Sequence, residues 1–185
     1  QLRGHVEPPS PIKNYLGEAG WHLRDSNWDP DFGVSAQRAE WFLDKEIDKS
    51  VDGVIALDLD LIKSILDGPG PLYLSDFNTQ VDAANLYQKT QAEVESNFFP
   101  GSIKKETFLT SLTRELLSRI TKMDKKTSLL VAKAVLSALA EKHIQIFLHN
   151  QEAQKPINNL NWDGGVPIPD CSGNCYADWV GVVEA

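Results

Sequence analysis

Blocks of apolar and polar residues follow one another along the chain in a pattern that predicts alternating helices and strands. Ser35 is a suitable N-cap for a helix running to about Asp48, because an apolar face follows it. Val51–Leu57 is a short continuous apolar run, typical of a central strand covered on both faces. A second short strand is expected at Leu72–Leu74.

The second half of the chain carries the longer helical patterns. Leucines recurring at three- and four-residue steps predict an amphipathic helix over 108–120. Asp124 is placed to cap a helix over 127–141 that has few polar positions, so we expect it to be buried on more than one side. A strand is predicted at 143–148, a polar irregular segment after it, and a final strand from Tyr176 onward.

Strands that alternate with helices indicate an α/β fold class. We expect one layered domain spanning residues 1–185, with a central mixed or largely parallel sheet flanked by helices. A chain of 185 residues with 42% hydrophobic content is long and apolar enough to bury one full core.

Charge and hydropathy exclude some functions. The 26 acidic residues outnumber the 18 Lys and Arg, giving a net charge of -8, so nucleic acid is not an expected partner. No apolar run reaches the roughly 20 residues of a membrane span, and no signal peptide is visible. Both ends look cut from a longer protein, so any membrane attachment would come from a segment absent from this chain.

The two cysteines, Cys171 and Cys175, lie in one polar loop with a central glycine. A disulfide closing this loop is geometrically possible and would indicate an oxidising compartment. The alternative is a pair of reduced surface thiols. No third cysteine or adjacent histidine is present, which disfavours zinc.

The stretch Trp21–Phe32 concentrates aromatic, charged and amide side chains more than any other part of the sequence. It is expected to be an irregular loop. Arg24, Asp25 and Asn27 are the candidate ligand-binding residues, because a guanidinium and an amide can bind a phosphate or a sugar. The alternative is that Arg24 and Asp25 pair and fix the loop against the tryptophans.

Two pairs of carboxylates have the spacing that hard cations often use. Asp29 and Asp31 are the candidate ligands for a divalent cation such as magnesium, with turn formation and pairing to Arg24 as the alternative. Asp58 and Asp60 are better explained as caps of a helix over 61–66. No nucleophile motif, P-loop or dinucleotide-binding motif is present, so no catalytic residue is assigned.

Several stretches together resemble the C-terminal part of the DUF4012 family, whose function is unknown. They span most of the chain: residues 18–21, 23–32, 35–36, 51–58, 70–74, 97–101 and 178–185. The resemblance implies a bacterial protein, anchored by an upstream membrane helix, whose domain lies outside the cytoplasm. The family's further N-terminal segment and its continuation after the last strand are missing here.

A more distant similarity is to the LytR-CpsA-Psr domain, an α/β fold that transfers glycopolymers from a lipid-pyrophosphate carrier to the cell wall. It covers the strand from Val51, the helix from Asp60 and residues 70–74. That family grips pyrophosphate with several arginines, whereas this chain offers Lys89, Lys104 and Lys105 in the comparable region.

Two functional hypotheses follow. The first is an extracytoplasmic, cell-envelope-associated domain that binds or transfers a phosphorylated polyprenyl or cell-wall glycan ligand. Arg24 would contact phosphate, and Asp25, Asp29 or Asp31 would orient it or hold the cation. As an enzyme it would resemble a glycopolymer phosphotransferase. The second hypothesis is a non-catalytic surface or adhesion module that interacts with a partner.

Overall fold

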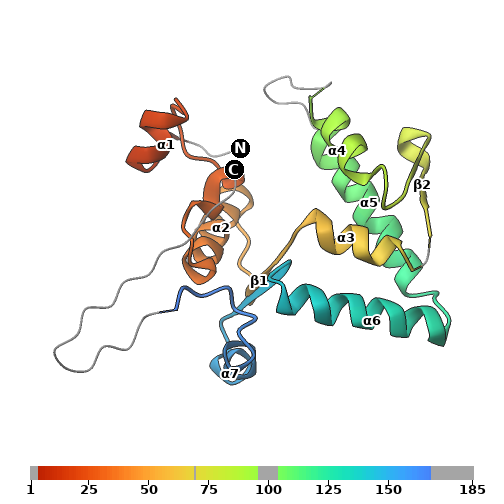
Figure 1. The fold of residues 1–185 in the computed structure, drawn as a ribbon. Helices are drawn as coiled ribbons and strands as arrows, with labels where there is room; N and C mark the ends of the chain where they lie inside the picture. Colours follow the sequence, from red (N-terminus) through yellow and green to blue (C-terminus); the bar gives the residue numbers. More distant parts are fainter. Residues whose placement is uncertain (1–3, 69, 96–103, 168–185) are drawn as a thin grey trace. The chain divides into compact units, whose positions relative to one another are not determined.

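The computed structural model describes residues 4–68, 70–95 and 104–167, which form a mixed α/β structure (Figure 1). The chain divides into two compact units. Unit 1 contains the described residues of Gln1–Ile55 and of Gln145–Ala185, and unit 2 is Ala56–Ile144. Unit 2 is thus inserted in the sequence between the two segments of unit 1.

Unit 1 is built around the long helix α2 (Phe32–Ile47). The 3₁₀ helix η1 (Leu23–Trp28) packs on α2, and helix α1 (Ser10–Tyr15) precedes η1 in the chain. Phe42 is fully buried and makes edge-to-face contacts with Trp21 and Trp41. Helix α7 (Gln151–Asn159) begins at Asn150, whose side chain accepts hydrogen bonds from two backbone amides.

Unit 2 is mainly helical. It contains α3 (Leu59–Leu66), α4 (Leu86–Glu95), α5 (Lys104–Ile120) and α6 (Lys125–Ala140). Helix α3 packs on α6, and α5 packs on α4 and on β2 (Leu72–Leu74) (Figure 1). Strand β2 turns through η2 (Ser75–Phe77) into β3 (Thr79–Val81).

The sheets of the described residues are small and antiparallel, and the predicted central mixed or largely parallel sheet is not confirmed among them. Strand β2 pairs with β3, with Leu72 opposite Val81. Strand β1 (Gly53–Leu57) pairs with β4 (Ile144–Leu148). The tight turn after β2 returns the chain beside itself, so no crossover helix creates a parallel neighbour. The strand predicted from Tyr176 lies outside the described residues.

Burial also differs from the predictions. Ile55 and Leu57 of β1 are exposed, so this strand is not covered on both faces. Helix α6 buries Val131, Ala138 and Leu139 but exposes other leucines, so the prediction of burial on more than one side is wrong. An apolar composition raises the average burial of a helix without deciding which neighbours are available to cover it.

Side-chain caps also fix where α2, α3 and α6 begin. Asp58 accepts a hydrogen bond from the Leu61 amide, and Asp124 accepts one from the Thr127 amide, as predicted. Asp31 caps α2, and its carboxylate accepts a hydrogen bond from the Val34 amide; the prediction of Ser35 as its N-cap is wrong.

In the parts of the chain that the structure describes, no helix combines the length and hydropathy needed to cross a membrane.

Candidate functional site

Arg24 and Asp25 are held by partners within unit 1. The Arg24 guanidinium lies 2.8 Å from a Glu18 carboxylate oxygen and 3.4 Å from a carboxylate oxygen of Asp25. The indole of Trp21 donates a 2.9 Å hydrogen bond to the Asp25 carbonyl. Asn27 sits at a kink inside η1, where the backbone leaves helical geometry. These contacts match the structural alternative for the loop, while ligand binding stays a prediction.

Asp29 and Asp31 both organise the start of α2. Asp29 accepts a 2.9 Å hydrogen bond from the backbone amide of Asp31. One Asp31 oxygen caps α2, and the other accepts from the Val166 amide at 3.1 Å. Each carboxylate thus has a structural task, and their role as cation ligands stays a prediction. Cys171 and Cys175 lie outside the described residues, so the disulfide is also untested.

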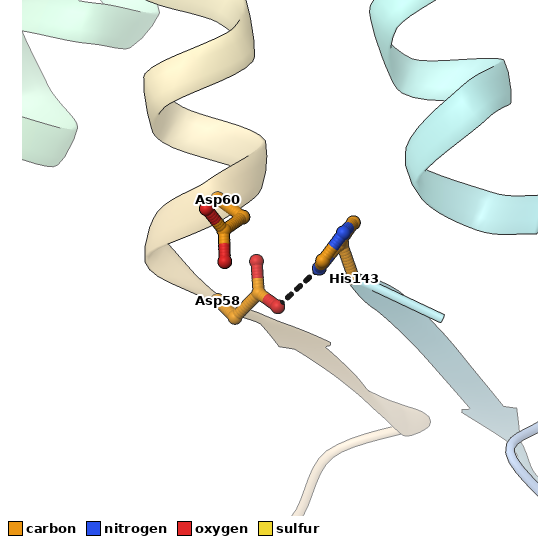
Figure 2. Close-up of side chains that lie close together, drawn as sticks. All are labelled: Asp58, Asp60 and His143. Carbon is orange, nitrogen blue, oxygen red and sulfur yellow. Dashed lines mark hydrogen bonds and ion pairs between the residues drawn. The ribbon is translucent and has the colours of Figure 1, made fainter. Parts of the chain in front are cut away.

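Three other side chains converge in unit 2, as Figure 2 shows. Asp58, Asp60 and His143 can each offer one donor atom such that all three atoms lie within 4.8 Å of one another. Two carboxylates and an imidazole at this spacing form the kind of donor set that divalent cations use. This group is the best candidate site among the described residues.

The backbone explains why these residues meet. Asp58 directly follows β1 and caps α3, and Asp60 lies in the first turn of that helix. His143 lies between α6 and β4, and its carbonyl accepts a 3.3 Å hydrogen bond from the Asp58 amide. The cluster therefore forms where the end of β1 lies beside the start of β4.

An ion pair dominates the electrostatics of this cluster. The Nδ1 atom of His143 lies 2.6 Å from Asp58 Oδ2, and its Nε2 atom lies 3.6 Å from a Glu141 oxygen. The hydrogen bond to Asp58 raises the pKa of His143, and the negative charges of Asp58, Asp60 and Glu141 add to this effect, while burial opposes it.

A tyrosine on α4 borders the cluster. Desolvation, followed by a hydrogen bond to Asp60 and by the charges of Asp60 and Asp58, raises the pKa of Tyr87 to about 12. The phenol therefore keeps its proton at neutral pH. A neutral donor beside Asp60 can orient that carboxylate without adding another charge.

Sequence reasoning missed this site because its parts are far apart. Asp58 and His143 are 85 positions apart, and no spacing rule connects them before the pairing of β1 and β4 is known. The available signal was local: two carboxylates follow one predicted strand, and a histidine begins another. Interpreting Asp58 as a helix cap was correct but incomplete, since its second oxygen contacts His143.

The ion pair predicts a pH-dependent stability. Because the folded-state pKa of His143 is raised above 6.5, its contribution is complete below that pH and is lost as the pH rises through the folded-state value. We expect the free energy of unfolding of the wild type to fall over this range by more than that of His143→Gln. Urea unfolding in chelator-treated buffer at a series of pH values measures both. Parallel curves for the two proteins would contradict the assignment.

Comparison with known proteins gives a match for part of the chain. No curated protein and no solved structure matches it. Residues 3–94 match a family model. This stretch contains the Trp21–Phe32 segment, Asp58 and Asp60, whereas His143 lies beyond it. The family matched over residues 3–94 is DUF4012, described as a protein of unknown function, which confirms the resemblance over that stretch.

Proposed function

We propose that unit 2 binds a divalent cation through Asp58, Asp60 and His143. The observation that carries this proposal is the convergence of their three donor atoms within 4.8 Å. The cation would take the place of the proton between Asp58 and the imidazole, and their 2.6 Å separation would have to widen to admit the ion. Folding brings the three ligands together, so little further ordering would be required for binding.

The donor set indicates which cations should bind best. Carboxylates alone suit Mg²⁺ and Mn²⁺, whereas an imidazole favours Zn²⁺ over both. We therefore expect affinity to decrease from Zn²⁺ to Mn²⁺ to Mg²⁺. Magnesium, which the sequence suggested for Asp29 and Asp31, would here use the carboxylates of Asp58 and Asp60.

The cation would serve a phosphorylated ligand. In this proposal the chain corresponds to the C-terminal part of its family and has a LytR-CpsA-Psr-like core in an extracytoplasmic, envelope-associated protein. A polyprenyl phosphate or a phosphorylated glycan would bind through the cation. The resemblance to LytR-CpsA-Psr supports this ligand class, since its segment from Val51 to Leu74 includes both aspartates. A transferase reaction would additionally need a group that carries out the transfer.

Calorimetric titration with Zn²⁺, Mn²⁺ and Mg²⁺ tests the cation site. Asp60→Asn should weaken binding at least tenfold, because it removes a charged ligand while leaving the Asp58 cap in place. His143→Gln should weaken Zn²⁺ more than Mg²⁺. Asp67→Asn makes the same charge change on an exposed residue at the end of α3 and should leave all three affinities unchanged.

The same variants test the ligand. Farnesyl pyrophosphate, used as a soluble polyprenyl pyrophosphate, should bind more tightly with Mg²⁺ than without it, and Asp60→Asn should remove the difference. Equal cation affinities for wild type and Asp60→Asn would overturn the site. Cation binding without any effect on farnesyl pyrophosphate would retain the site and reject the ligand.

A second candidate function is a non-catalytic interaction module. It is favoured by the ion pairs and hydrogen bonds that charged residues of the Trp21–Phe32 stretch make within unit 1. These residues are Arg24, Asp25, Asp29 and Asp31, and their contacts support the fold. In that case neither the cation nor Arg24→Ala would change the binding of farnesyl pyrophosphate.

A further inference from the structure

The surface of unit 1 carries an open groove of about 560 Å³ beside α2. Polar and aromatic side chains from α2, from the segment after it and from the end of β4 line it. Those that matter for recognition are Gln37, Glu40, Trp41, Ser50, Phe147 and His149. A concave surface with a few polar groups among aromatic rings is the usual form of a small-molecule site.

Side chains of both charge signs line this groove. Both oxygens of Glu40 lie 2.9 Å from the Nε2 atom of His149, and the side chain of Glu40 is only 15% exposed. Asp44 pairs with Lys45 at 2.8 Å. Lys49 also lines the groove, together with the carboxylates of Glu40 and Asp44, so positive charge does not exceed negative charge there and a neutral ligand is favoured over a phosphate.

The remaining polar groups suit a ligand with several hydroxyls. Gln37 and Ser50 can each donate and accept hydrogen bonds, and the Glu40 carboxylate has lone pairs beyond those that face His149. Trp41 and Phe147 line the groove from different elements and can cover the C–H face of a ring. The ring of Trp41 is fixed by its edge-to-face contact with Phe42. A pyranose sugar has both the hydroxyls and the apolar face that this arrangement requires.

A smaller, apolar pocket continues from the groove. It has a volume of about 290 Å³ and shares Glu40 and Val51 with the groove. Leu23, Leu43 and Ile55 also line it, and Leu23 and Ile55 are exposed. Water in contact with this surface would be released by an alkyl chain extending from a sugar bound next to it.

We propose that unit 1 binds a neutral glycoside, with the sugar in the polar groove and an apolar aglycone in the pocket beside it. The two adjoining surfaces have the two chemical characters of such a ligand, and Glu40 stands at their boundary. This site lies within unit 1, involves no cation and goes beyond the function proposed for unit 2.

Matched amphiphiles test the proposal. Calorimetry in chelator-treated buffer, below the critical micelle concentrations, compares n-octyl β-D-glucoside and n-octyl N-acetyl-β-D-glucosaminide with their methyl glycosides and with triethylene glycol mono-octyl ether. At least one octyl glycoside should bind tenfold more tightly than its methyl counterpart, since each buried methylene contributes about fourfold in affinity. It should also bind tenfold more tightly than the octyl ether, which lacks the sugar.

Variants assign the two parts of the ligand. Glu40→Gln should weaken the octyl glycoside at least fivefold and leave the octyl ether unchanged. Leu23→Ser should reduce the advantage of the octyl over the methyl glycoside, whereas Leu136→Ser, which removes an exposed leucine from α6, should not. Circular dichroism of each variant confirms folding. The proposal is overturned if neither octyl glycoside binds the wild type, or if the octyl ether binds equally well. Either result would leave the cation titrations of unit 2 unaffected.

Discussion

Substitution of Phe42 by alanine is expected to lower the free energy of unfolding of unit 1 by about 3–5 kcal/mol. The side chain is 0% exposed, so truncation removes a whole ring from the interior and leaves a cavity behind it. The edge-to-face contacts with Trp21 at 5.7 Å and Trp41 at 5.1 Å are lost at the same time. Urea unfolding followed by tryptophan fluorescence measures the change, because both partners are tryptophans.

The control for this experiment lies on the same helix. Ile47 is more than half exposed, so Ile47→Ala removes little buried area and should cost less than about 1 kcal/mol. If Phe42→Ala destabilised the protein no more than Ile47→Ala, Phe42 would not be the centre of the unit 1 core.

Gly53→Ala is expected to destabilise unit 1 by about 3 kcal/mol or more. A Cβ atom at this position would lie 2.3 Å from the Phe147 carbonyl oxygen and 2.9 Å from the Leu148 Cα atom. Replacing glycine in a strand by alanine normally gains roughly 0.5–1 kcal/mol, because glycine loses more backbone entropy on folding. The clash outweighs this gain, because the Phe147 carbonyl oxygen and the Leu148 Cα atom belong to the backbone. Rotation of a side chain cannot relieve it.

Gly20→Ala provides the comparison for Gly53→Ala. Its new methyl group would meet the His22 ring at 3.4 Å, an ordinary contact, and its backbone does not have a positive φ. Thermal unfolding should therefore give a similar Tm for Gly20→Ala and the wild type, and a lower one for Gly53→Ala. An unchanged Tm for Gly53→Ala would show that β1 and β4 do not approach as closely as described.

Local chemistry made several elements predictable. Asp58 and Asp124 precede apolar helical patterns, and both cap helices through the amide three residues later. Helix α7 was missed because Pro156, three asparagines and two glycines over 156–165 suggested an irregular segment. Proline lacks an amide proton and disfavours a helix interior, yet Asn150 caps this helix with two hydrogen bonds, and its C-terminal turns continue past the proline.

Pairing between distant segments was not predictable. The Trp21–Phe32 stretch was expected to form an irregular loop, but residues 23–28 form a 3₁₀ helix whose polar groups bond to near neighbours. In contrast, the contact of Asp58 with His143 depends on which strands pair, and apolar runs of similar length do not specify their partners. The candidate cation site could therefore be recognised only from coordinates.

The insertion of unit 2 between the two segments of unit 1 leads us to expect an order of folding. Pairing of the Asp52 carbonyl with the His149 amide closes a loop of nearly a hundred residues. From an unstructured chain this closure would cost roughly 4 kcal/mol in entropy. Once unit 2 has formed, the hydrogen bond from the Asp58 amide to the His143 carbonyl already holds the first and last residues of unit 2 near each other. We therefore expect unit 2, the more helical unit, to form first and the strand pairing of unit 1 to follow it.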